Sequence, residues 1–147
     1  MFKNYLASVA ALDQVILHKK HIDQAIDGLT QIQYDRNIVK SVVSGVIRNY
    51  ETLLSWTKQH TNIKPKDRSL RYLIFCGIFQ LKFLERRSAA AVIYDAAEVT
   101  KHLNREWAKS MVYAVLKRAD RSEIPRKVDL PNRRSLWFAL MVFFQPQ

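Results

Sequence analysis

The sequence contains few residues that break helices and only one that could cross-link the chain. Its single cysteine, Cys76, excludes an intramolecular disulfide framework and is typical of a reducing compartment. Only three glycines and four prolines occur among 147 residues, and three of the prolines fall at Pro125 or beyond. The first 120 residues therefore favour helices over sheet.

Long apolar runs are also missing. None reaches the roughly 18 to 20 residues that a membrane-spanning helix needs. Asp13 interrupts the apolar part of the N-terminal segment, and the cations of that segment follow this part instead of preceding it, so we expect an amphipathic helix and not a secretory signal peptide. A chain of this length can bury a real core without disulfides. We expect an all-α cytoplasmic domain that does not span a membrane.

Positive charge is abundant and unevenly distributed. The formal net charge is +11, which predicts salt-sensitive attraction to polyanions, nucleic acid first and anionic membrane second. Residues 1–57 sum to +1, 58–87 to +6, 88–100 to −2 and 101–134 to +6. The two basic blocks would form one patch only if the fold brings them together, as an antiparallel helix pair would.

The segment from Lys64 to Arg87 predicts the centre of the fold. Apolar side chains recur there at helical spacing on several faces, which is typical of a helix enclosed by other helices. One face holds Leu70, Leu73, Ile74, Gly77, Ile78, Leu81 and Leu84, and much of the other holds Tyr72, Phe75, Cys76, Phe79 and Phe83. We expect a central apolar helix over about 67–85 in a bundle of six or seven helices.

Capping residues and apolar periods predict the other helices. Expected helices cover about 2–18, 22–29, 36–54, 89–101 and 105–121. The third is predicted to run unbroken past Tyr50, because its apolar period continues there. The expected N-caps are Asp35, Asp67, Ser88 and Asn104, and Trp107 is expected on the inner face of the last helix. Gly45 is expected to allow close approach of a neighbouring helix.

Four spaced motifs occur in a recognisable order. They are SGVIR at 44–48, the segment 64–86, AVIYDAAE at 91–98 and KSMVYAVLK at 109–117. In this order they resemble the all-helical NusB-like RNA-binding fold, and most closely the amino-terminal domain of the ribosomal RNA small-subunit (16S) cytosine-5 methyltransferase B family. The resemblance covers roughly residues 1–121 and implies a helical bundle that binds RNA, with ribosomal RNA as the expected partner.

The departures from that family shape the functional expectation. The family's Gly-rich S-adenosylmethionine loop and Pro-Cys catalytic dipeptide are missing from this sequence, so we expect no catalytic residue, cofactor or metal site, and no enzyme activity of this chain on its own. Tyr113 stands where the family pattern has asparagine. We interpret residues 1–121 as the RNA-binding domain, stand-alone or truncated, and 122–147 as an irregular tail.

An alternative interpretation is a NusB-type antitermination or protein-interaction module that docks a partner subunit. The apolar segment 136–144 of the tail is the expected docking element for a protein partner. Free-standing NusB antiterminators carry an arginine-rich N-terminal tail, whereas only Lys3 precedes Leu6 here. RNA binding is therefore the first interpretation.

Several chemistry-bearing residues are better explained by structure than by catalysis. Cys76 lies mid-helix among aromatic residues, so we expect a core cysteine and not a nucleophile. His18 and His21 lie beside two lysines, which disfavours a metal site. Asp95 and Glu98 share a helix face, where a structural salt bridge or a helix cap is the preferred interpretation.

The basic residues are the candidate RNA contacts, with phosphate contacts expected to position the RNA and not to specify its sequence. The candidates are Lys64, Lys66, Arg68, Arg71, Arg86, Arg87, Lys109, Lys117, Arg118 and Arg121. About six phosphate contacts would give a slope of log affinity against log salt near −4 on single strands. Four aromatic residues in or between the basic blocks, Tyr72, Tyr94, Trp107 and Tyr113, offer stacking faces for bases, although most are expected in the core.

Overall fold

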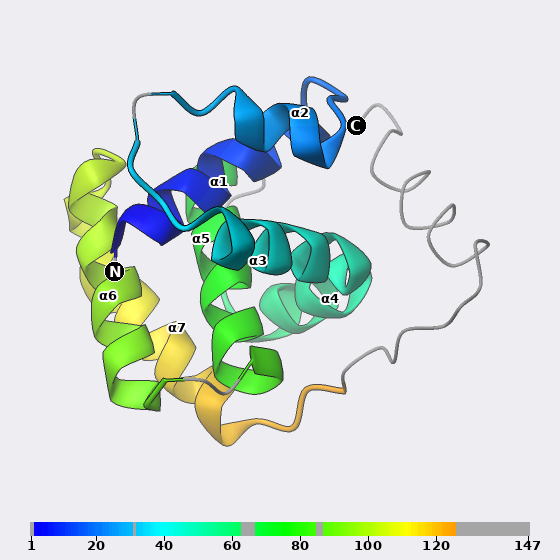
Figure 1. Ribbon diagram of the computed structural model, residues 1–147. Helices are drawn as coiled ribbons and strands as arrows, with labels where there is room; N and C mark the ends of the chain where they lie inside the picture. Colours follow the sequence, from blue (N-terminus) through cyan, green and yellow to red (C-terminus); the bar gives the residue numbers. More distant parts are fainter. Residues whose placement is uncertain (1, 31, 63–66, 85–86, 126–147) are drawn as a thin grey trace.

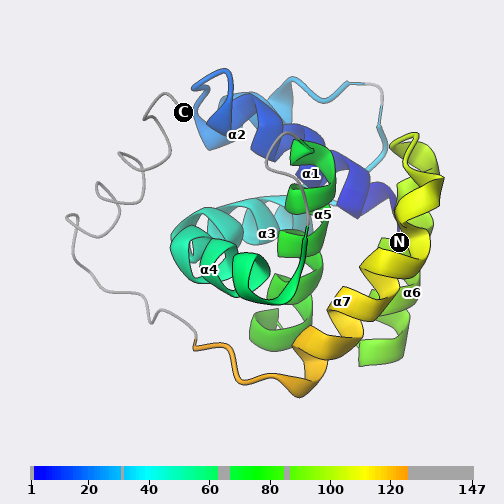
Figure 2. The same cartoon turned by 180° about the vertical axis from the view of Figure 1, so that it is seen from behind.

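The computed structural model describes residues 2–30, 32–62, 67–84 and 87–125. Within these ranges the chain is all-helical (Figures 1 and 2), as the sequence predicts. The elements are α1 (Phe2–Ile16), α2 (Ile22–Asp27), α3 (Arg36–Arg48), α4 (Tyr50–His60), α5 (Arg68–Phe79), the π-helical turn η1 (Gln80–Leu84), α6 (Ala89–His102), the 3₁₀ turn η2 (Glu106–Ala108) and α7 (Lys109–Arg121). No helix among the described residues is long and apolar enough to cross a membrane.

Helix α5 forms the centre of the bundle, which confirms the expected core helix. Every residue from Leu70 to Phe79 is buried, because α1, α3, α6 and α7 surround this helix. Figure 1 shows α5 between α3 and α4 on one side and α6 and α7 on the other, with α1 crossing near one end. Asp67 caps α5 by accepting a hydrogen bond from the backbone N–H of Leu70 at 3.3 Å.

Two glycines bring helices against α5 more closely than any other residue would allow. A Cβ atom placed on Gly45 of α3 would lie 2.1 Å from two ring atoms of Phe79. A Cβ atom on Gly77 of α5 would lie 2.8 Å from a terminal carbon of Leu116 in α7. Normal carbon–carbon contacts are about 3.5–4.0 Å. The expected role of Gly45 in close helix packing is therefore confirmed.

The predicted unbroken helix across Tyr50 is wrong, because the chain breaks at Asn49 into α3 and α4. Asn49 has φ −106° and ψ 17°, outside the helical region. Its buried side-chain amide donates a hydrogen bond to the backbone oxygen of Gly45 at 2.8 Å. Such local side-chain bonds compete with the helical backbone pattern. The apolar period continues past the break because both helices pack against α5.

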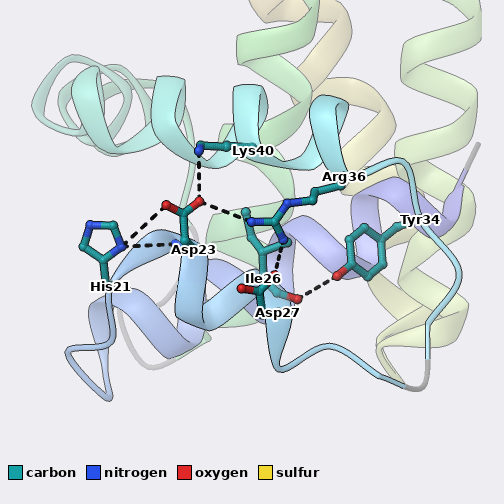
Figure 3. A network of polar contacts seen from close by, with 7 residues as sticks. All are labelled: His21, Asp23, Ile26, Asp27, Tyr34, Arg36 and Lys40. Atoms are coloured by element: carbon teal, nitrogen blue, oxygen red, sulfur yellow. Dashed lines mark hydrogen bonds and ion pairs between the residues drawn. The ribbon is translucent and has the colours of Figure 1, made fainter.

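A polar network fixes α2 against the start of α3 (Figure 3). Asp35 caps α3 as predicted, accepting from the backbone N–H groups of Asn37 and Ile38. Asp23 in α2 pairs with Lys40 Nζ at 2.9 Å and with Arg36 Nη2 at 3.4 Å. Arg36 and Lys40 thus have carboxylate partners within the bundle, which limits their contribution to any surface field.

The start of α6 agrees with the prediction, whereas the connection between α6 and α7 does not. Ser88 caps α6 as expected, accepting from Ala91 N–H at 3.2 Å. Asn104, however, does not cap the last helix. Its φ of 57° places it in the left-handed region that commonly ends a helix, and asparagine tolerates that conformation. The turn η2 then precedes α7 and leaves Trp107 72% exposed, so the predicted inner position of Trp107 is wrong.

Candidate nucleic-acid interface

The start of α6 lies beside the end of α7, because the two helices pack as an antiparallel pair (Figure 2). The small residues Ala89 and Ala90 in the first turn of α6 leave room between the helices there. The result is a hollow of about 490 Å³, which we call the α6–α7 groove. Its walls are Ala89, Ala90, Ile93 and Tyr94 from α6, and Tyr113, Lys117, Asp120 and Arg121 from α7.

The end of the central helix joins the same end of the bundle. Lys82 in η1 donates a hydrogen bond from its ammonium group to the backbone oxygen of Asp120 in α7, at 3.2 Å. Arg87 follows η1 and precedes α6. Lys82 of the first basic block therefore meets the α7 cations of the second block, whereas the side chain of Arg87 lines a separate hollow beside α1 and α3.

The cations of this end differ in what they contact. Lys117, Arg118 and Arg121 are exposed on the last turns of α7, and the ammonium group of Lys117 lies 5.2 Å from the centre of the Tyr113 ring. Arg87 Nη1 forms an ion pair with Asp95 Oδ2 at 2.6 Å. A phosphate that contacts Arg87 must therefore share this arginine with a carboxylate.

The pKa of Asp95 is lowered in part by that pairing. Partial burial of Asp95 raises its pKa, but hydrogen bonds and nearby positive charge, including those of Arg87, outweigh the burial and hold the pKa below its ordinary value. Asp95 therefore stays ionised and keeps Arg87 in place. The preferred interpretation of Asp95 as an ion-pairing residue is confirmed.

Other predicted contact residues lie elsewhere. Arg68 begins α5, at the end of that helix away from Lys82, and its Nε atom lies 3.5 Å from Asp13. Arg71 is buried, with 9% of its surface exposed, so it is a poor candidate for an RNA contact. Lys64, Lys66 and Arg86 lie outside the described residues, as does the expected docking segment 136–144.

Lys109 is held by the other acidic residue of α6. Its Nζ atom lies 2.5 Å from Glu98, whose second oxygen is 3.3 Å from Lys101. Hydrogen bonds from Lys109 and then Lys101 lower the pKa of Glu98, and the bond to Glu98 raises the pKa of Lys109. Lys109 therefore links α7 to α6 through an ion pair, and Glu98 is confirmed as an ion-pairing residue.

Most of the candidate stacking residues are on the surface, so their expected core placement is wrong for three of the four. The exposed fraction is 62% for Tyr94, 44% for Tyr113 and 72% for Trp107, whereas Tyr72 is buried. Helical spacing could have placed Tyr94 correctly. It follows Ile93 by one residue, so it points about 100° away from the buried stripe of α6.

Cys76 and His21 occupy structural positions. Cys76 is fully buried in α5, and burial raises the pKa of its thiol far above the ordinary value, so the core prediction is confirmed. His21 caps α2, its Nδ1 accepting from Asp23 N–H at 3.3 Å (Figure 3). Within the described ranges, no group of three or more histidine, cysteine or carboxylate side chains could hold a metal ion.

A second hollow lies at the opposite end of α7. It has a volume of about 830 Å³ and a largely apolar surface. Trp107, Met111, Ala114 and Val115 form one side, and Leu70 and His60 contribute from α5 and α4. Trp107 thus belongs to a different surface from the α6–α7 groove.

Sequence comparison identifies the class of protein that this fold represents. Residues 5–121 match the NusB family, so the chain belongs to that family. A curated relative is the ribosomal RNA small subunit methyltransferase B of Xanthomonas campestris pv. campestris. It is 30% identical over 124 residues, which cover 82% of this chain and 28% of that protein. The chain therefore spans less than a third of the length of this relative.

Proposed function

We propose that this NusB-family domain binds ribosomal RNA, and that phosphates are held by the cations at the end of the α6–α7 groove. The observation that carries the proposal is the contact of Lys82 in η1 with the end of α7, where Lys117, Arg118 and Arg121 are exposed. Lysine and arginine contacts to phosphates hold the RNA in place without reading its sequence. The similarity to a small-subunit ribosomal RNA methyltransferase supports the choice of RNA.

The salt dependence of binding tests the phosphate contacts. Four contacts release enough counterions to give a slope of about −3 for log affinity against log salt on a single strand. Fluorescence anisotropy with labelled small-subunit ribosomal RNA fragments measures this slope. An affinity that does not change with salt would refute the phosphate contacts. Equal affinity for an RNA of the same length and unrelated sequence would refute the preference for ribosomal RNA.

A matched pair of variants locates the contacts. Lys117→Gln with Arg121→Gln removes two exposed cations from the groove and should reduce the magnitude of the slope by about 1.4. Lys20→Gln with Lys58→Gln removes the same charge from exposed positions elsewhere and should change the slope much less. Arg87 is left intact in both variants, because its loss would leave Asp95 without this ion pair. Equal slopes for the two variants would place the RNA on another surface.

We propose further that this chain contributes binding and does not itself transfer a methyl group. Methylation of cytosine at position 5 by the enzymes it resembles needs a thiolate, and the one cysteine of the chain is enclosed in α5 with a raised pKa. Incubation with small-subunit RNA and S-adenosylmethionine carrying a labelled methyl group tests this. Label incorporated into the RNA would overturn the proposal.

Docking of a protein partner is the second candidate function, and the hollow beside Trp107 favours it. A tryptophan that is 72% exposed next to an apolar hollow is typical of an interface anchor. The family resemblance implies a ribosomal protein as the partner. Trp107→Ala should then abolish binding of that protein, measured by calorimetry, and leave RNA affinity unchanged. An unchanged protein affinity would refute this role of the hollow.

A further inference from the structure

We propose that the α6–α7 groove selects single-stranded RNA by stacking unpaired bases on Tyr94 and Tyr113. This inference rests on the proposed RNA binding and adds the structural state of the RNA that is bound. Both tyrosine rings line the same hollow, one from each helix, and Tyr94 is 62% and Tyr113 44% exposed. Large aromatic side chains left in water beside a hollow are available to a flat ligand.

The shape of the groove suits a base better than a bulky side chain. Ala89 and Ala90 form part of the wall at the start of α6, so little side-chain volume occupies the space between the two rings. The hollow of about 490 Å³ falls within the range of about 300–1,000 Å³ that is common for small-ligand pockets. Stacking on aromatic rings is tolerant of base identity, because every base has a π-face.

The charges around the rings fit a nucleotide chain. Lys117 lies above the Tyr113 ring, and Arg121 lies on the same wall one turn further along α7. Lys117 and Arg121 line the same hollow as both tyrosines, so a nucleotide chain that enters it meets two cations. Asp120 also lines the groove and opposes an anion, so the cations of α7 must outweigh it.

Base pairing would prevent this mode of contact. In an A-form duplex the faces of the bases are stacked inside the helix, and only edges, phosphates and 2′-hydroxyls are presented to a protein. Tyr94 and Tyr113 can stack only on bases that are unpaired, in loops, bulges or single strands. Phosphate contacts alone would not distinguish single strands from duplexes in this way.

The test compares two probes and matched variants of the 147-residue chain. The probes are a fluorescein-labelled uridine 12-mer and a labelled RNA duplex of 12 base pairs, and anisotropy gives affinity at several salt concentrations. Tyr94→Ala and Tyr113→Ala should each weaken binding of the 12-mer by about fivefold or more, with the salt slope unchanged. Tyr94→Phe and Tyr113→Phe keep the ring and should bind like the original chain. Trp107→Ala, an exposed aromatic on the other hollow, should have no effect.

The outcomes separate this inference from the proposed function. Weaker binding in the alanine variants with a retained salt slope, together with preference for the 12-mer over the duplex, supports stacking. If the alanine variants bind normally while the Lys117→Gln and Arg121→Gln pair binds weakly, the stacking inference fails and RNA binding stands. If the original chain shows no salt-dependent binding, RNA binding itself fails.

A direct readout of contact complements affinity. A 12-mer that carries 4-thiouridine should form photo-crosslinks to peptides containing Tyr94 or Tyr113, identified by mass spectrometry. Crosslinks confined to other peptides would overturn the inference. Thermal unfolding of each variant by circular dichroism should match the original chain, because both rings lie largely outside the core.

Discussion

Replacing Gly45 by alanine should destabilise the bundle, although alanine is the better helix former. The added methyl carbon would lie 2.1 Å from two ring atoms of Phe79, well inside the normal contact distance of about 3.5–4.0 Å. The ring cannot simply swing away. Phe79 is only 5% exposed and packs edge-on against Phe83, with ring centres 5.7 Å apart. Helix α3 must therefore move outward, or the Phe79 ring must leave its preferred rotamer.

The magnitude follows from two opposing effects. Overpacking of a well-packed core costs about 1–3 kcal/mol, and the close approach here places the cost at the upper end. The gain in helix propensity from glycine to alanine offsets about 1 kcal/mol. We expect a net loss of about 1–2 kcal/mol in the free energy of unfolding. Urea unfolding followed by circular dichroism measures this loss, and the melting temperature should fall by roughly 2–8 °C.

Gly28→Ala is a matched control, for which the free energy of unfolding should change in the opposite direction. It has φ −75°, which any residue adopts, and a Cβ atom there would meet only backbone oxygens at 3.5 and 3.7 Å. Gly28→Ala should therefore stabilise the domain by about 0.4–1 kcal/mol, because it reduces the freedom of the unfolded chain. A Gly45→Ala variant as stable as Gly28→Ala would refute the close contact between α3 and α5.

A double-mutant cycle isolates the contact itself. In a Phe79→Leu background the planar ring is gone, so Gly45→Ala should cost less than it does alone. The coupling energy between the two sites should fall in the range of about 0.5–3 kcal/mol that is usual for residues in contact. Strictly additive effects would show that the methyl group does not meet the ring.

Two further predictions concern the ion pairs and the core thiol. The pKa of Glu98 in the folded state is lowered below its ordinary 4.5, so its contribution to stability is present above pH 4.5 and is lost as the pH falls through the folded pKa. Glu98→Gln should therefore make the free energy of unfolding depend less on pH in the acid range. An unchanged pH dependence would contradict the ion pairs with Lys109 and Lys101. Cys76 should not react with Ellman's reagent in the native protein and should react fully in urea, because burial shields the thiol and raises its pKa. Rapid reaction of the native chain would contradict the buried position of Cys76 in α5.

The parts of the fold that follow from short-range chemistry could be predicted from the sequence. The apolar faces of 70–84 identify the central helix because only enclosure by other helices can bury them all. Asp35, Asp67 and Ser88 act as caps within three residues of their own position, so local sequence suffices. The break at Asn49 could not be predicted in this way. It depends on a buried amide bonding to Gly45, while the apolar period continues on both sides.

The aromatic residues of the candidate site show a different limit. Most of the four aromatic candidates are expected in the core from the sequence, yet three of the four are exposed. Tyr94 could have been placed by its angle from Ile93 on α6. Trp107 could not, because its exposure depends on the left-handed residue Asn104 and the 3₁₀ turn that follows.

Linear charge blocks also overstate the positive field of the folded domain. Arg68 and Lys82 belong to one block, but fourteen residues of helical chain carry them roughly 20 Å apart, to opposite ends of the bundle. The two carboxylates of the acidic segment between the blocks do not act as one negative patch. They are divided between Arg87 on one side and Lys101 and Lys109 on the other. The charge facing the α6–α7 groove therefore comes mainly from the last turns of α7, because the side chain of Arg87 lines a different hollow and pairs with Asp95. Four exposed cations give an expected salt slope of about −3, in place of the −4 expected for about six phosphate contacts.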